Sequence, residues 1–172
     1  MTEVARLRPY GPEHDAATVV WLNSGELRST FGFQGVITLE SHRRWVEAAK
    51  DVRIWAIVDG RDLHCGNTLL HVNARHRSAY FQIYIGEPRA RGKGIGDAAL
   101  CLALERAFDH LALHRVWLHT FGDNVAAESL YRKRGFILEG IERDAILTDG
   151  GFVTQNRWSM LAEEWRQVEA RA

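Results

Sequence analysis

The stretch from Ile83 to Gly96 constrains the fold of this chain more than any other part of it. An apolar run ends at Gly86, a basic turn with a proline follows, and three glycines at alternate positions lead into a segment of helix-forming composition. A strand, a glycine loop and a helix start form an anion site, because glycines let successive N–H groups point inward and the helix N-terminus adds a partial positive charge. Arg91 and Lys93 add full positive charges. The stretch therefore predicts a site for a phosphate or pyrophosphate.

Two common nucleotide sites do not fit this loop. A P-loop needs serine or threonine after its lysine, but Gly94 follows Lys93. A dinucleotide-binding loop needs a third glycine where this chain has Asp97. The pattern that remains is Arg-x-x-Gly-x-Gly, from Arg91 to Gly96. Taken alone, this pattern is also compatible with a basic loop that binds nothing.

Composition indicates an ordinary globular chain of 172 residues, with 46% apolar and 26% charged residues, and we expect a single domain over 1–172. The chain has 22 Lys and Arg residues and 22 Asp and Glu residues, so its formal net charge is zero and a nucleic-acid partner is not expected. No run is long and apolar enough to span a membrane, and no signal peptide is evident. Cys65 and Cys101 lie in apolar segments, which predicts buried thiols in a cytoplasmic protein. No metal is expected, although His110 and His114 leave a metal pair as a minor alternative.

In the first half of the chain, the pattern predicts an α+β arrangement of helices and antiparallel strands. Trp45, Val46 and Ala49 are expected to face inward from one helix, and Gly66 is expected at a bulge or a close backbone approach. The expected strands are 4–8, 53–58, 63–72 and 79–85, and the expected helices are 12–22 and 39–50, with a loop or second short helix over 26–36.

In the second half, the helix after Gly94 carries a core-facing stripe of five apolar residues that ends at Leu111. A helix over 125–134 is capped by Asn124 at its start and by Gly135 at its end. The expected strands are 115–121, 137–141 and 152–161.

A second motif follows the glycine loop by about two elements: Asn124-x-x-Ala127-x-x-Leu130-Tyr131-x-x-x-Gly135-Phe136. Asn124 and Tyr131 are seven residues apart, so two helical turns place both on one side of their helix. Together with Arg91–Gly96, this motif resembles the GNAT superfamily of acyl-CoA-dependent N-acyltransferases. The resemblance covers nearly the whole chain.

The resemblance implies a mixed, mostly antiparallel sheet of about seven strands flanked by helices. Its fourth and fifth strands, Ala79–Ile85 and Arg115–Phe121, would splay apart around the thioester of acetyl-CoA. Asn124 would contact the pantetheine and Tyr131 would act as the general acid, while a backbone N–H near Ile85 would polarise the carbonyl. The remaining expected acetyl-CoA contacts are Ile83, Tyr84, Ile85, Arg91, Gly92, Lys93, Gly94, Ile95 and Gly96.

Two resemblances bear on the acceptor. Ile83-Tyr84-Ile85-Gly86, Glu139-Gly140-x-x-Arg143 and Asp149-Gly150 are similar to the ribosomal-protein-alanine and spermidine acetyltransferase branch. A second resemblance is to acetyltransferases of nucleotide-linked amino sugars. It rests on Trp21-x-Asn23 with Arg28, and on Thr38-x-Glu40-x-His42-x-x-Trp45. The expected acceptor is therefore a primary amine of a small molecule or of a peptide N-terminus, with the amino sugar as an alternative.

Several roles stay open at this level. Glu26, Phe33 and His119 are candidates for the substrate side, and the general base could be Glu26, Glu87 or His119. Tyr131 could instead be a packing residue. The chain could also be a non-catalytic acyl-CoA sensor or could transfer a longer acyl group. A homodimer is a possible assembly.

Overall fold

The computed structural model describes residues 4–31, 35–148 and 150–170. The chain divides into two compact units. Unit 1 comprises residues 1–71 and 82–103, and unit 2 comprises residues 72–81 and 104–172. Both units therefore contain residues of β3 (His64–Asn73), β4 (Ser78–Ile85) and α4 (Ile95–Glu105). Phe33, a predicted substrate residue, lies outside the described residues, as does Asp149.

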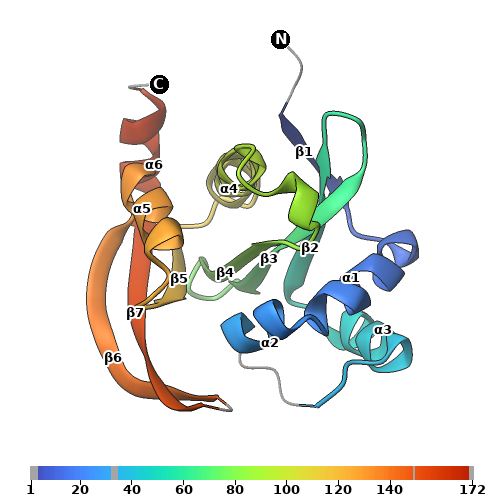
Figure 1. Ribbon diagram of the computed structural model, residues 1–172. Coiled ribbons are helices and arrows are strands. Elements are labelled where there is room, and N and C mark those ends of the chain that lie inside the picture. Colours follow the sequence, from blue (N-terminus) through green and yellow to red (C-terminus); the bar gives the residue numbers. More distant parts are fainter. Residues whose placement is uncertain (1–3, 32–34, 149, 171–172) are drawn as a thin grey trace. The chain divides into compact units, whose positions relative to one another are not determined.

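Unit 1 is built from antiparallel strands and from helices on both of their faces (Figure 1). β1 pairs with β2, and β2 pairs with β3, with a register shift between Ile57 and Val58. The elements are β1 (Ala5–Pro9), η1 (Pro12–His14), α1 (Asp15–Leu22), α2 (Gly25–Phe31), α3 (Leu39–Ala48), β2 (Val52–Asp59), β3 (His64–Asn73), β4 (Ser78–Ile85), η2 (Pro88–Ala90) and α4 (Ile95–Glu105).

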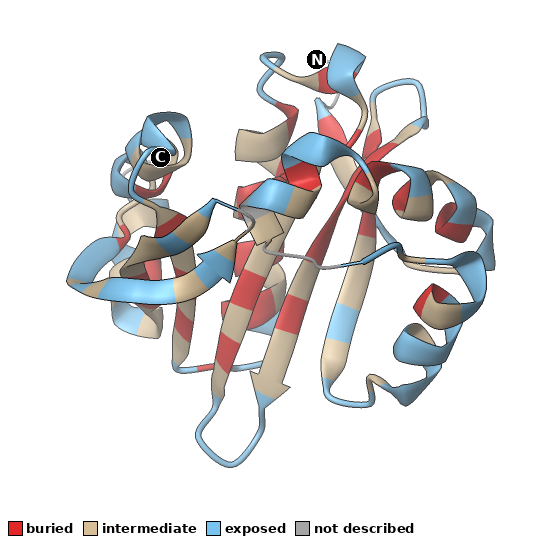
Figure 2. Cartoon of the chain, turned by 60° about the horizontal axis from the view of Figure 1, so that its bottom comes forward, coloured by how far each residue is buried: buried red, intermediate tan, exposed pale blue. Residues whose placement is uncertain are grey.

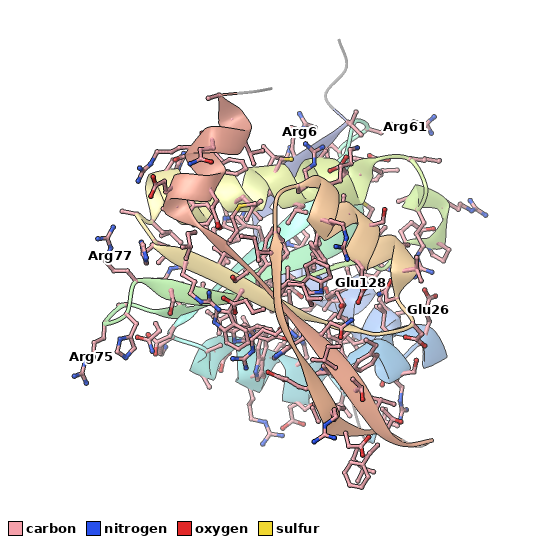
Figure 3. The ribbon with its side chains drawn as sticks, turned by 90° about the vertical axis from the view of Figure 1, so that its left-hand side faces the viewer. Arg6, Glu26, Arg61, Arg75, Arg77 and Glu128 are labelled. Atoms are coloured by element: carbon pink, nitrogen blue, oxygen red, sulfur yellow. The ribbon has the colours of Figure 1, made fainter. Side chains whose placement is uncertain are left out.

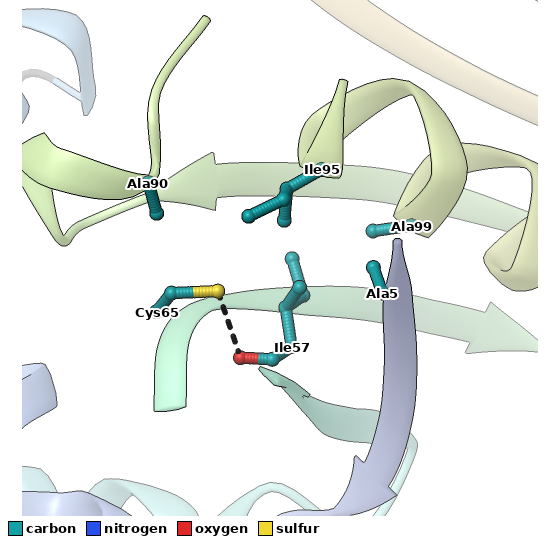
Figure 4. Close-up of a cluster of buried hydrophobic side chains, with 6 residues drawn as sticks. All are labelled: Ala5, Ile57, Cys65, Ala90, Ile95 and Ala99. Atoms are coloured by element: carbon teal, nitrogen blue, oxygen red, sulfur yellow. Dashed lines mark hydrogen bonds between the residues drawn. The ribbon is translucent and has the colours of Figure 1, made fainter. Parts of the chain in front are cut away.

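The two faces of β4 in unit 1 pack against different clusters. Ile83 and Ile85 pack on the buried cluster that joins β1, β2 and β3 to the start of α4, which Figure 4 shows with Cys65 donating to the carbonyl oxygen of Ile57. Tyr84 belongs to a second cluster, with Trp21 of α1 and Leu27 of α2. This alternation follows from the two-residue period of a strand, and Figure 2 shows it as changes between buried and half-buried colours along the strands.

Unit 2 contains η3 (Arg106–His110), β5 (Arg115–Phe121), α5 (Val125–Lys133), β6 (Ile137–Thr148), β7 (Gly151–Leu161) and α6 (Ala162–Glu169). β7 pairs antiparallel with both β5 and β6. Trp158 of β7 is buried, donates a hydrogen bond to Thr120 at 3.0 Å, and has the guanidinium of Arg132 over its ring at 5.1 Å. One side chain of α5 thus contacts β7.

The strand order β1-β2-β3-β4-β5-β7-β6 confirms the predicted mixed sheet of seven strands. Its parallel pair is β4 with β5. The pairing joins Ser78–Tyr80 to Arg115–Trp117, which are the first three residues of each strand, as expected for strands that separate further along. The expectation of a single domain stays a prediction.

Some local expectations were wrong. Leu111 is 36% exposed, although the stripe placed it in the core. The helix widens into η3, where the N–H of Leu111 donates to the carbonyl of Arg106, so the wider turn carries Leu111 out of line with the stripe. Trp45 is 42% exposed, although it also lines the cavity described below, and Cys101 is only half-buried. β6 continues to Thr148 instead of ending at Ile141, because it pairs with β7 along most of its length.

Candidate functional site

The glycine loop in unit 1 has the backbone geometry of an anion cradle. Gly92 and Gly94 have φ values of +69° and +77°, a region that favours glycine, and a Cβ on either would meet no atom within 4 Å. α4 begins directly afterwards at Ile95, and the N–H groups of its first turn have no partners inside the helix. The loop therefore leaves room for a ligand at the positive end of a helix.

The strand side of the loop is held by backbone contacts. Gly86 is buried against the ring of Trp21, where a Cβ would overlap that ring. Glu87 caps η2, since its Oε1 accepts from the N–H of Arg89 at 3.2 Å, and its own N–H donates to the carbonyl of Cys65 at 3.0 Å. Glu87, a candidate base, thus has a structural contact of its own.

Arg91 joins the loop to α2. Its Nε donates to the carbonyl oxygen of Ile85 at 3.0 Å, and its Nη1 lies 2.5 Å from Oε2 of Glu26. Glu26 lies at the surface on α2, where Figure 3 labels it. The structure thus brings together two predicted site residues, Glu26 and Arg91. Lys93 lies exposed in the same loop.

The predicted cofactor residues on either side of the loop differ in what their side chains contact. Ile95 is buried in the cluster with Ile83 and Ile85, so only the backbone of Ile95 can face a ligand. Tyr84 points to the opposite side of β4, where its hydroxyl accepts from Nδ2 of Asn67 at 2.7 Å. Burial raises the pKa of Tyr84 to about 12, so it stays protonated.

A cavity of about 400 Å³ lies in unit 1, and the sequence did not predict it as a site. Its lining comes from three helices, three strands and the segments that connect them. The apolar part of its wall comprises Leu22, Phe31, Ile37, Trp45, Ile54 and Leu69. The sequence signals were the pattern around His42 and Trp45 and the aromatic residues Phe31 and Tyr84, whereas the remaining lining residues are scattered along the first half of the chain.

The polar residues Tyr10 and His42 of the cavity wall bond to each other, and Tyr10 also bonds to a carboxylate behind the wall. The hydroxyl of Tyr10 lies 2.9 Å from Nε2 of His42 and donates to Oδ1 of Asp15 at 3.1 Å. Nε of Arg43 donates to Oδ2 of Asp15 at 2.9 Å. Burial lowers the pKa of His42 and raises that of Tyr10, so both groups favour their uncharged forms.

Asn124 and Tyr131 belong to unit 2. Asn124 caps α5 as predicted, since its Oδ1 accepts from the N–H of Ala127 at 3.1 Å. Tyr131 is only 7% exposed, and its ring centroid lies 5.4 Å from that of Phe136. Burial, and secondarily Tyr80, raises the pKa of Tyr131, so its phenol keeps its proton at neutral pH.

His119 of β5, also in unit 2, lies in an ionic and aromatic cluster. Its Nε2 lies 3.1 Å from Oε2 of Glu142 and 3.4 Å from Nε of Arg157, and the guanidinium of Arg157 covers the ring of Trp117 at 4.9 Å. His119 is half-buried. These contacts orient its imidazole.

The described residues contain no group of three His, Cys, Asp or Glu side chains placed to hold a metal ion. Within the same ranges, no helix has the length and apolar character needed to cross a membrane.

Comparison with known proteins identifies a matching family and structures with a similar fold. A family model described as "Acetyltransferase (GNAT) domain" matches residues 5–137. Spermidine N(1)-acetyltransferase of Vibrio cholerae serotype O1 is 34% identical over 97 residues, which are 56% of this chain and 56% of that protein. The Escherichia coli K12 enzyme of the same name is 40% identical over 72 residues, 42% of this chain and 38% of that protein. The matched part thus spans about half or less of these relatives.

The fold is similar to that of a solved enzyme. The crystal structure of spermidine N-acetyltransferase from Vibrio cholerae in complex with CoA and spermine has a TM-score of 0.89 at 24% identity, covering 94% of this chain and 98% of that one. At this identity the likeness concerns the fold. The family model covers most of the chain, and its match includes the glycine loop and Tyr131. The chain therefore belongs to the GNAT acetyltransferase family.

Proposed function

We propose that this protein transfers an acetyl group from acetyl-CoA to a primary amine by direct attack of the amine on the thioester. The observation that carries the proposal is the left-handed backbone of Gly92 and Gly94 at the start of α4, in a chain of this family. This loop suits a pyrophosphate because it has no Cβ at these two positions and has Arg91 and Lys93 beside them.

The residues divide into three proposed roles. Arg91 and Lys93 supply positive charge for the pyrophosphate, and the backbone of Gly92–Gly96 supplies N–H donors. The backbone of β4 from Ile83 to Ile85 supplies donors for the pantetheine arm and the thioester carbonyl, and the side chain of Asn124 contacts that arm. The hydrogen bond from Nε of Arg91 to the carbonyl oxygen of Ile85 supports the first role, because it holds the arginine beside the loop.

Acetyl-CoA supplies the acetyl group and a sulfur leaving group. The amine must arrive without its extra proton, and a C–N bond then forms as the C–S bond breaks. Tyr131 donates its phenolic proton to the departing sulfur. The buried phenol carries its proton at neutral pH, which a general acid requires. Glu26, Glu87 and His119 remain candidates for accepting the proton of the amine.

The acceptor is a primary amine of a small molecule or a peptide N-terminus. The names of the relatives favour a small-molecule amine, since both curated enzymes are spermidine acetyltransferases. A sensor that binds acetyl-CoA without turnover is the contrasting function, and a measurement of thiol release with a panel of amines separates the two.

Gly94→Asp tests the proposed acetyl-CoA site. A carboxylate about 4 Å from a phosphate is repelled by ~4 kcal/mol near a protein surface, so we expect acetyl-CoA affinity to fall by about 100-fold or more. Isothermal titration calorimetry with acetyl-CoA measures this directly.

Gly94→Asn is the matched control, because asparagine has a similar shape, no charge, and a tolerance for positive φ. It should lose much less affinity than the aspartate variant. Equal affinity of wild type and a folded Gly94→Asp protein would exclude the glycine loop as the binding site.

A further inference from the structure

The cavity in unit 1 and the glycine loop share one strand. Gln82 and Tyr84 of β4 line the cavity, whereas Ile83 and Ile85 face the buried cluster with the start of α4. β4 ends at Ile85, and the loop follows at once. Given the proposed function, on which this inference rests, the cavity is the place in unit 1 where an acceptor can lie next to the strand that carries the thioester.

The wall of this cavity is largely apolar and aromatic. Its apolar side chains come from α1, α2, α3 and β3, which contribute Leu22, Phe31, Trp45 and Leu69 respectively. Phe31 and Tyr84 are in edge contact, with ring centroids 5.6 Å apart. The volume of about 400 Å³ falls in the range of roughly 300–1,000 Å³ that is usual for small-molecule sites.

The polar groups on the wall pair with one another. Nδ2 of Asn67 donates to Oγ1 of Thr18 at 2.8 Å and to the hydroxyl of Tyr84 at 2.7 Å. Nε2 of His71 lies 2.9 Å from Oε1 of Gln82. A ligand in the cavity therefore meets hydrogen-bonding groups that already have partners, and apolar contact is what it can gain most.

Formal charge is missing from the cavity wall. None of its lining residues within the described ranges is an aspartate, glutamate, lysine or arginine. Asp15 is the carboxylate behind Tyr10 and His42, but it is 3% exposed and paired with Arg43. A polyamine carries additional ammonium groups away from the reacting amine, and burying these without counter-charges is unfavourable.

From this charge distribution we infer that the acceptor is a monoamine with an apolar, ring-bearing body, and that a polyamine is a poor acceptor. The ring lies among Phe31, Trp45 and Leu69, and the amine is directed toward β4. The relatives named for spermidine thus differ from this chain in acceptor class, although the chain shares their fold.

Steady-state thiol release with acetyl-CoA tests the inference. The acceptors are 2-phenylethylamine, spermidine and a short peptide that begins with alanine. We expect kcat/KM for 2-phenylethylamine to exceed that for each of the others by about tenfold or more. A higher kcat/KM for spermidine or for the peptide would overturn the inference while leaving the proposed function intact.

Calorimetry with saturating CoA separates the two claims, because CoA has no acetyl group to transfer. Binding of 2-phenylethylamine to this complex is expected, whereas its absence overturns the inference. Failure of CoA itself to bind contradicts the proposed function instead.

Trp45→Ala locates the ring. Trp45 is partly exposed and lines the cavity, so its truncation is expected to leave the fold intact and to raise KM for 2-phenylethylamine about tenfold, with KM for acetyl-CoA unchanged. Leu39→Ala is the control. Leu39 is an exposed apolar residue of α3, like Trp45, but it is not among the residues that line the cavity. An equal effect of both variants, or none from Trp45→Ala, would overturn the placement.

Discussion

The glycine loop of unit 1 and the Tyr131 cluster of unit 2 carry their proposed chemistry in different ways. In the loop, the groups proposed to face the ligand are backbone amides, and the property of Gly92 and Gly94 that matters there is that they have no side chain. In the cluster, the proposed reactive group is the single hydroxyl of Tyr131, on a buried ring that packs against Phe136. A backbone site is therefore disrupted by adding atoms, and a side-chain site by removing one.

The difference also separates binding from reaction. Added bulk or charge at the loop should change acetyl-CoA affinity, as expected for Gly94→Asp. Loss of the hydroxyl in unit 2 should change the rate of the chemical step and leave affinity alone. The following variants test this contrast, in order of decreasing effect.

Tyr131→Phe should have the largest effect on rate. It keeps the ring packed against Phe136 and removes only the proton donor, and general acid catalysis is typically worth about 10²–10⁴-fold. We expect a decrease of that size in the single-turnover rate, with acetyl-CoA affinity and melting temperature nearly unchanged.

Ser129→Ala is the control for this variant, because it removes one hydroxyl from the exposed face of the same helix and should leave the rate unchanged. A full single-turnover rate for Tyr131→Phe across pH would assign Tyr131 to packing, and water or another donor would then protonate the sulfur.

Gly66→Ala tests whether an added side-chain atom also disrupts the close approach of β3 to β4, the strand that precedes the loop. A Cβ on Gly66 would overlap the carbonyl oxygen of Tyr84, so β3 and β4 would have to move apart. We expect a loss of about 1–3 kcal/mol in the free energy of unfolding, measured by urea denaturation. Gly140→Ala on β6 is the control, since a Cβ there meets no atom within 4 Å. Equal stability of the two variants would show that the approach at Gly66 relaxes without cost.

Glu139→Gln should have the smallest effect, and one that depends on pH. Hydrogen bonding to Arg115 lowers the pKa of Glu139 from 4.5 to about 2. The pair therefore stabilises unit 2 fully above about pH 4.5, and this contribution is lost as pH falls toward 2. Because both side chains are partly exposed, we expect at most about 1 kcal/mol, or ~2–4 °C in melting temperature.

Melting curves of wild type and Glu139→Gln between pH 7 and pH 2 measure this difference. The two should converge at the acidic end. A constant difference over the whole range would mean that the effect does not come from the charge of Glu139.

Local features of the fold could be predicted because neighbouring residues determine them. Three such features were predicted from single residues: the helix cap at Asn124, the left-handed backbone at Gly135 and the close approach of strands at Gly66. Each requires a particular residue type because only that type suits the local backbone geometry. The stripe on the helix after the loop was right for Leu100 and Leu104 and wrong for Leu111. A wider turn at η3 changed the period there, and the apolar pattern carries no sign of such a turn.

The sequence by itself determined the strand, glycine loop and helix of the proposed acetyl-CoA site, and the motif that contains Asn124 and Tyr131. Both are short segments whose chemistry lies in adjacent residues. Only the tertiary structure decided which side of β4 each residue faces, that Glu26 pairs with Arg91, and that residues from Tyr10 to Tyr84 enclose a cavity without formal charge. Such contacts join residues far apart in the chain, and their charge balance exists only after the elements pack together.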